Sequence, residues 1–167
     1  MKIPIVNERD EIIGYKDRED RTPGDTIRIT AIWITDENGH ILLQQRKLTK
    51  KYNPGKWGPA VSGTVEEEET YDSNAVKEME EEIGLTNIPL EKSQKFYGLS
   101  NTGKRFCQLY TAKIPRETKL IPEEDEVENL KWFTKEELKK YLDENPNEFV
   151  GLMQDLKFLL NYNEIKI

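Results

Sequence analysis

Residues 63–85 read G-T-V-E-E-E-E-T-Y-D-S-N-A-V-K-E-M-E-E-E-I-G-L, and the rest of the chain is interpreted outward from this stretch. A glycine and a short acidic loop precede a run that predicts a helix from about Thr70 to Ile83, which Gly84 ends. Apolar side chains spaced three and four apart predict the inward stripe of that helix. The stripe consists of Ala75, Val76, Met79 and Ile83.

The same helix concentrates carboxylates. Glu78, Glu81 and Glu82 stand at i, i+3 and i+4, which places them close together on one face. Like charges at this spacing destabilise a helix unless something compensates them. Hard divalent cations take oxygen ligands, so the cluster suits Mg²⁺. A solvated acidic helix face is the alternative interpretation of this run.

The stretch resembles the signature of the Nudix hydrolases, G-x5-E-x7-R-E-U-x-E-E-x-G-U, where U is a bulky aliphatic residue. The matching positions are Gly63, Glu69, Glu78, Met79, Glu81, Glu82, Gly84 and Leu85. Lys77 departs from the pattern, which has arginine at that position. Lysine keeps the charge but lacks the planar fork of guanidinium, so we expect the acid that it supports to be held less rigidly.

Length and charge bound the remaining possibilities. A chain of 167 residues predicts one domain, with a β-hairpin at about 3–16 and a C-terminal helical extension at about 146–163. The net charge is −7 and no extended basic face is evident, which argues against nucleic acid polymers and membranes as partners. An acidic protein that acts on phosphates needs a metal ion to offset its charge.

Cysteine content and the absence of apolar runs predict a cytoplasmic protein. Cys107 is the single cysteine, so no internal disulfide can form. The N-terminal residues lack the apolar run of a signal peptide, and no segment approaches membrane-spanning length.

The rest of the chain alternates β-rich runs with turn signals. Strands are expected at 3–6, 12–15, 26–35, 41–46, 57–63, 90–100, 104–114 and 126–133. Thr134 and Glu137 have capping-box spacing and predict a helix to about 143, and Asn145-Pro146 predicts the start of another. That last helix carries an apolar stripe that is either core or a homodimer interface. Its members are Phe149, Leu152, Met153, Leu156, Leu159 and Leu160.

The strand at 41–46 ends in Arg46, and Pro54, Gly55 and Trp57 follow, which is also similar to Nudix chains. Guanidinium matches phosphate oxygens in pairs, so Arg46 is a candidate substrate-binding residue, with a structural ion pair as the alternative. Lys77 is the second candidate for contact with substrate.

The resemblance implies an α/β (α+β) fold, a Nudix-type α/β/α sandwich with a mixed sheet and a loop-helix-loop motif. It implies Mg²⁺-dependent hydrolysis, with Mn²⁺ as the alternative ion, of a diphosphate in a nucleoside diphosphate derivative or related small organic pyrophosphate. Glu78, Glu81 and Glu82 would bind the metal, and Glu69 would support the catalytic cluster. The general base is either Glu82 or Glu126, between which the sequence does not choose.

Two other functions fit parts of the sequence. The hairpin, the Q-Q-R strand and P-G-K-W resemble the branch related to isopentenyl-diphosphate isomerase. That isomerase uses a cysteine just before the motif, whereas this chain has G-P-A-V-S-G there, which argues against isomerisation. A Nudix-fold module that binds a nucleotide without cleaving it is the other alternative, and the intact acids argue against it.

Overall fold

The computed structural model describes residues 1–100 and 102–161, and its strands form one mixed sheet around β3 (Thr26–Thr35). β3 is rich in β-branched residues and is buried continuously from Thr30 to Ile34, as expected for a central strand. It pairs in parallel with β8 (Gly103–Lys113), from Thr26 opposite Lys104 to Thr35 opposite Lys113. All other strand pairs in the described chain are antiparallel.

The remaining strands flank this pair. β1 (Lys2–Val6) lies between β2 (Ile12–Asp17) and β3, and β7 (Glu91–Ser100) pairs with β8 alone. The others are β4 (Ile41–Arg46), β5 (Trp57–Pro59), β6 (Val61–Thr64) and β9 (Val127–Phe133). β4 pairs with β3 only at Ile41 and Leu42, and then with β5 and β9, whereas β6 pairs with β3. The sheet therefore splits into two branches, and Ala60 connects them.

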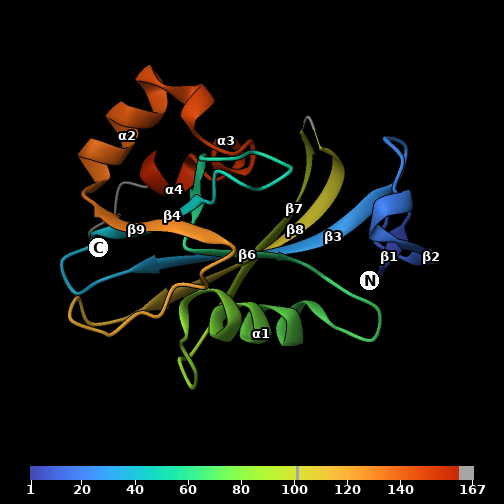
Figure 1. Ribbon diagram of the computed structural model, residues 1–167, viewed down its shortest axis with the longest axis horizontal. Helices are drawn as coiled ribbons and strands as arrows, with labels where there is room; N and C mark the ends of the chain where they lie inside the picture. The colour runs from blue at the N-terminus through green and yellow to red at the C-terminus, as the bar shows by residue number, and fades with distance from the viewer. Residues whose placement is uncertain (101, 162–167) are drawn as a thin grey trace, which may run out of the picture.

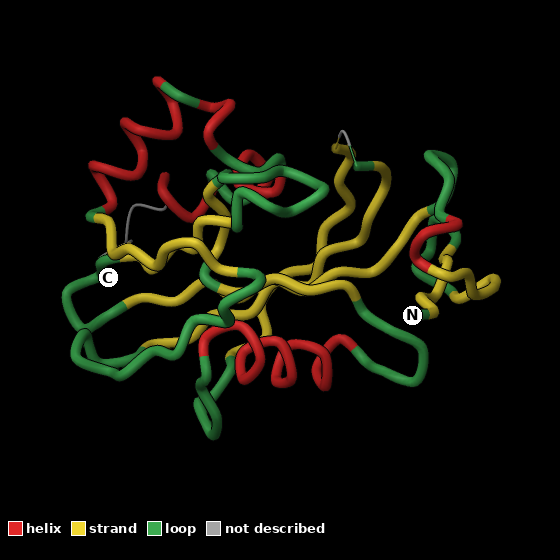
Figure 2. The backbone as a smooth tube through the Cα atoms, viewed as in Figure 1, coloured by secondary structure: helices red, strands yellow, loops and turns green. Residues whose placement is uncertain are grey.

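Helices cover both faces of the sheet (Figures 1 and 2). α1 (Tyr71–Ile83) lies on one face, and α2 (Lys135–Glu144), α3 (Leu152–Asp155) and α4 (Phe158–Asn161) lie on the other (Figure 1). Two short 3-10 turns, η1 (Arg18–Asp20) and η2 (Pro146–Glu148), precede β3 and α3. None of the helices within the described residues is long and apolar enough to cross a membrane.

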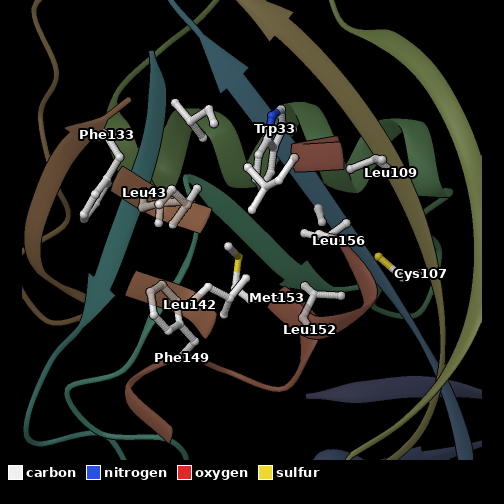
Figure 3. Packing of buried hydrophobic residues seen from close by; sticks show 14 residues of the cluster. Trp33, Leu43, Cys107, Leu109, Phe133, Leu142, Phe149, Leu152, Met153 and Leu156 are labelled. Carbon is white, nitrogen blue, oxygen red and sulfur yellow. The ribbon is translucent and has the colours of Figure 1, made fainter. Parts of the chain in front are cut away.

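Each helical layer has its own apolar core. Ala75, Met79 and Ile83 of α1 pack against Ile32 and Tyr110. On the opposite face, Trp33, Leu43 and Leu109 pack against residues of α2 and α3, as Figure 3 shows. These other residues include Leu142, Leu152, Met153 and Leu156.

The caps of α1 follow the sequence, but one predicted inward residue does not. Thr70 and Ser73 form a capping box, and Gly84 ends the helix with φ at 72°. Val76, however, is 58% exposed, so its place in the predicted inward stripe is wrong. The buried face is centred on Ala75 and Met79, and Val76 lies about 100° further round the helix than Ala75, toward solvent. Asn74 is buried there instead.

Two other elements are divided where one was expected. The predicted strand at 57–63 is two strands, because the chain passes from β4 to β3 at Ala60. The predicted helix at 146–163 is broken after η2, where the Val150 N–H donates to the Trp57 carbonyl at 2.8 Å. Residues 162 and 163 of that prediction lie outside the described residues. The apolar stripe is mostly buried in the core, so a homodimer would have to use another surface.

Candidate active site

Glu82 lies where the sheet divides and is bonded to both branches. Its carboxylate accepts hydrogen bonds from Gln44 Nε2 on β4 at 3.0 Å and from the Ser62 N–H on β6 at 3.3 Å. Gln44 Nε2 also donates to the Ala60 carbonyl at 3.0 Å. Glu82 is only 8% exposed. The division of the sheet therefore positions a buried carboxylate of α1 between two strands.

Glu78 lies one turn earlier and explains the first glycine of the motif. A Cβ at Gly63 would overlap the Glu78 side chain, so glycine at this position leaves the space that the side chain occupies against β6. Glu78 forms a long ion pair with Lys77, whose Nζ is 3.9 Å from Glu78 Oε1. This distance is too long for a hydrogen bond.

Burial raises the pKa of both acids. The pKa of Glu82 rises to about 8, because burial outweighs the hydrogen bonds from Gln44 and Ser62, and Glu78 adds repulsion. The pKa of Glu78 rises to about 7, where burial and the charges of Glu81 and Glu69 outweigh the attraction of Lys77. Both carboxylates are therefore desolvated without a bound cation close enough to compensate them.

Glu81 and Glu126 complete the group of predicted acids. Glu81 is exposed, and its charge acts on Glu78. The charge of Glu126 acts on Glu82, but Glu126 Oε1 is itself bonded to Lys50 Nζ at 2.6 Å. Within the ranges described, no three His, Cys, Asp or Glu side chains are arranged tightly enough to hold a metal ion as they stand. The acids form one electrostatic cluster rather than a closed ligand shell.

Lys77 is turned toward the acids. Its Nζ lies 2.5 Å from Glu69 Oε1 and 3.1 Å from Glu66 Oε1. Burial alone would lower the pKa of Lys77, but the two carboxylates outweigh it and raise that pKa. The same bonds help to keep the pKa of Glu69 below its usual value despite burial. Lys77 thus fixes the acidic loop against α1, a role the sequence suggested beside contact with substrate.

Asn74 is a site residue that the sequence interpretation missed. Its Nδ2 donates to Glu69 Oε2 at 2.9 Å and approaches Glu78 Oε1 at 3.4 Å, while its Oδ1 accepts from the Thr30 hydroxyl at 2.6 Å. Asn74, Glu78 and Glu82 are spaced four residues apart and so share one stripe of the helix. That spacing is the signal that would have found Asn74. Alternation along β4, which puts Gln44 on the same face as Arg46, would have found Gln44.

Arg46 ends β4 beside this cluster. Its side chain is half-buried, and its Nε donates to the Tyr52 carbonyl at 3.1 Å. Burial lowers the pKa of Arg46, and the charges of Glu126 and Glu82 oppose that shift. Arg46 forms no ion pair with any described carboxylate. The structural ion pair that was the alternative for Arg46 is therefore not present.

The donors fit a hard divalent cation. They are carboxylate oxygens, which Mg²⁺ prefers; Glu82 has no cation bonded to it in the described chain, and at Glu78 the charge of Lys77 does not offset burial. A cation bound beside Glu78 and Glu82 would supply that charge.

Comparison with known proteins identifies the class. The model of the NUDIX domain family matches residues 25–152, and the chain belongs to this family. This match includes β3, the split in the sheet, α1 and β9, and so spans every acid described above.

Individual relatives agree with this assignment. The chain is 32% identical over 143 residues to the uncharacterized Nudix hydrolase YfcD of Escherichia coli strain K12, covering 85% of this chain and 78% of YfcD. It is 30% identical over 123 residues to the uncharacterized Nudix hydrolase PA4841 of Pseudomonas aeruginosa, covering 73% of each. The crystal structure of DR0079 from Deinococcus radiodurans has the same fold, with a TM-score of 0.82 at 22% identity over 96% of this chain and 98% of that one. The Nudix fold is thereby confirmed, whereas membership of the isomerase branch has no such support.

Proposed function

We propose that this protein is a Mg²⁺-dependent hydrolase that cleaves the diphosphate linkage of a nucleoside diphosphate derivative or related organic pyrophosphate. The observation that carries the proposal is the pair of acids at the split of a Nudix sheet: buried Glu82, which has no ion pair with any described cation, and half-buried Glu78, whose attraction to Lys77 does not offset burial. Glu78, Glu81 and Glu82 would hold the metal. Bound Mg²⁺, or Mn²⁺ in its place, supplies positive charge to the non-bridging phosphate oxygens.

The chain's own residues would do the rest of the work. Arg46, whose guanidinium lacks an acidic partner in the described chain, would bind a phosphate of the substrate. Lys77 and Asn74 would hold Glu69 and the loop before α1 in position. These side chains therefore serve binding and orientation rather than proton transfer.

Proton transfer is assigned to Glu82 in preference to Glu126. Glu82 lies at the split of the sheet beside Glu78, where the bound cation and its waters would be held. Glu126 is tied to Lys50 by a short ion pair. Glu82 would accept the proton of the attacking water, and the phosphate leaving group would depart from the opposite side.

The position of Cys107 argues against an isomerase. Cys107 is fully buried in the core beneath α3, on the face of the sheet opposite α1, as Figure 3 shows. Burial raises the pKa of its thiol to about 12. A thiol in this setting does not reach the acids of α1.

A phosphate-release assay tests the proposal. The protein would be incubated with Mg²⁺ and a panel of nucleotide sugars, dinucleotide cofactors, nucleoside triphosphates and isoprenyl diphosphates. The proposal predicts hydrolysis of at least one of them, lost in Glu81→Gln and Glu82→Gln while the fold is retained. If no compound is cleaved but one raises the melting temperature, the protein is a binding module and the proposal fails.

A further inference from the structure

A cavity of about 520 Å³ lies between the helical layer of α2 and α3 and the loop that connects β4 to β5. That loop passes close to α3 in Figure 1. Segments that are distant in the sequence line the cavity: the loop contributes Asn53 and Lys56, β7 contributes Ser100, η2 contributes Asn147 and α3 contributes Gln154. Sites for small molecules typically occupy about 300–1,000 Å³, so the cavity is large enough for one.

The walls of the cavity are bonded to one another. The Val150 N–H, just before α3, donates to the Trp57 carbonyl at 2.8 Å and so joins the helical layer to the end of the loop. Arg105 Nη2 on β8 donates to Asp155 Oδ2 on α3 at 2.9 Å, which joins the same layer to the β7–β8 hairpin. The fold therefore forms the cavity before any ligand binds.

The lining is rich in side-chain amides that are free to bind a ligand. Asn53, Asn147 and Gln154 form no side-chain hydrogen bond with any residue that the structure describes. Asp143, the acid of the lining, is paired with Lys157 Nζ at 3.4 Å. Amides both donate and accept hydrogen bonds, and so do hydroxyl groups. The lining therefore suits a ligand with several hydroxyl groups.

The same lining does not suit a nucleobase. Phe149 is its aromatic residue, and this side chain is only 3% exposed. The Tyr141 ring packs against the Phe149 ring with the centroids 4.9 Å apart. Bases are commonly held by stacking on an exposed aromatic face. A sugar, which is bound mainly through its hydroxyl groups, is the better fit.

Lys56 connects the cavity to Arg46, the proposed phosphate-binding residue. β4 and β5 pair at Gln45 and Trp57, and the Arg46 N–H donates to the Lys56 carbonyl at 2.9 Å. Lys56 thus lies opposite Arg46, and side chains of opposite residues on antiparallel strands are neighbours. Neither residue forms an ion pair with a described carboxylate. A phosphate bound by this pair of cations would lie at the rim of the cavity.

We propose that this cavity binds a sugar that is joined to the diphosphate of the substrate, so that the preferred substrates are nucleotide sugars. Arg46 and Lys56 would hold the diphosphate, and the amides of Asn53, Asn147 and Gln154 would bond to the hydroxyl groups of the sugar. This inference rests on the proposed function, from which it takes the position of the diphosphate. The segments that follow β4 and α2 would then determine specificity.

Binding of nucleotide sugars tests the cavity without hydrolysis. Calorimetry in EDTA would compare UDP-glucose with UDP and ADP-ribose with ADP. The wild type should bind at least one of the two nucleotide sugars about tenfold more tightly than its nucleoside diphosphate, since one or two added hydrogen bonds contribute on that order. This preference is expected although the sugar ester carries less negative charge than the free diphosphate.

Variants separate the sugar from the phosphates. Asn147→Ala/Gln154→Ala should bind the nucleotide sugar no more tightly than the diphosphate, whose own affinity should not change. Lys56→Gln should weaken both ligands by a similar factor. Gln94→Ala is the matched control, because Gln94 is exposed on β7 and does not line the cavity, and it should retain the preference. Asn147 and Gln154 are exposed as well, so these variants should remain folded, which thermal melting would verify.

Three results would overturn the inference: no preference for either nucleotide sugar, a preference that the double variant retains, or an equal loss in Gln94→Ala. Free glucose and ribose would be titrated in the same way. If either binds and is not displaced by the matching nucleotide sugar, the sugar has a separate site and the inference also fails.

The phosphate-release assay reports separately on the proposed function. A preference for a nucleotide sugar without any hydrolysis would support the cavity and refute the hydrolase. Hydrolysis of nucleoside triphosphates without a preference for a nucleotide sugar would support the hydrolase and refute the cavity.

Discussion

Two buried acids of this protein, Asp10 and Glu82, are equally hidden from solvent, but only Asp10 is bonded to cationic side chains. Each is 8% exposed. Asp10 lies in the turn between β1 and β2 and accepts hydrogen bonds from three side chains. The donors are Arg28 Nε at 2.7 Å, Lys95 Nζ at 2.6 Å and the Tyr71 hydroxyl at 2.9 Å. Glu82 receives only amide donors.

The difference appears in the pKa of each acid. Burial would raise the pKa of Asp10, but the hydrogen bonds from Lys95, Arg28 and Tyr71 outweigh it, and that pKa is lowered. Burial raises the pKa of Glu82 to about 8. The charge of the buried Asp10 carboxylate is therefore compensated by side chains of β3, β7 and α1, which it connects to the end of β1. Glu82 has no such partners, which is what the proposed metal site requires.

The largest expected effect is on catalysis at the unpaired acid. Glu82→Gln should reduce Mg²⁺-dependent hydrolysis by about 10²–10⁴-fold, since it removes a general base and a metal ligand. Its melting temperature should not fall, because neutral glutamine replaces a carboxyl group whose ionised form is disfavoured by burial. Glu80→Gln is the matched control, an exposed glutamate of the same helix at a variable position of the signature. If the two variants are equally active, Glu82 has no functional role.

The reverse result is expected at the paired acid. Asp10→Asn should lower the free energy of unfolding by about 3 kcal/mol, because it leaves Arg28 and Lys95 without their common partner. Hydrolysis per folded molecule should change little. Denaturant unfolding measures the first quantity and phosphate release the second. Glu8→Gln, in the same turn but exposed, should affect neither.

Asn74 provides an intermediate test, because it connects structural and catalytic groups. Asn74→Ala should raise the Mg²⁺ concentration needed for half-maximal activity by about 10–100-fold, as loss of support for metal ligands does elsewhere. Thr30→Val removes the hydroxyl that contacts Asn74 but no contact with Glu69 or Glu78. A matching shift in Thr30→Val would show that Asn74 acts through general stability rather than by orienting these acids.

The smallest effect is a difference in the pH dependence of stability without metal. The pKa of Glu82 is about 8 in the folded protein and 4.5 in the unfolded chain. As pH rises between these values, Glu82 loses its proton in the unfolded chain but keeps it in the folded protein. The free energy of unfolding therefore falls across that range. Asp10 has a lowered pKa, so its contribution is present above 3.8 and is lost only below it. Thermal melts in EDTA should show a smaller decline between pH 5 and 8 in Glu82→Gln than in the wild type.

The sequence predicted the regular parts of this molecule well, for identifiable reasons. The β-branched run of β3, the capping box at Thr134 and the left-handed Gly84 are local signals, and each element formed as expected. The motif acids Glu78, Glu81 and Glu82 lie on α1, as their spacing predicted. Local signals, however, do not report which strand a segment joins, so the division at Ala60 and the burial of Asn74 were not predicted.

The contacts of Asp10 with Lys95 and of Arg21 with Lys104 escaped prediction for the same physical reason. Asp10 and Lys95 are 85 residues apart, and Arg21 and Lys104 are 83 apart, so only the folded sheet brings them together. By contrast, the sequence named Arg46 as a candidate, because a recognisable P-G-x-W segment follows it along the chain. Contacts between distant segments decide which charges are neutralised, and hence which acids are left for a ligand.

Calorimetric titration of Mg²⁺ into the metal-free protein at pH 7, in buffers of different ionisation enthalpy, tests the central claim most directly. If Glu78 and Glu82, whose pKa values are raised, are the acids that take the cation, Mg²⁺ must displace protons from them as it binds. The wild type should bind Mg²⁺ with net proton release, and Glu82→Gln should bind it more weakly and release fewer protons. Binding with no proton release, or with the same release in Glu82→Gln, would contradict the account.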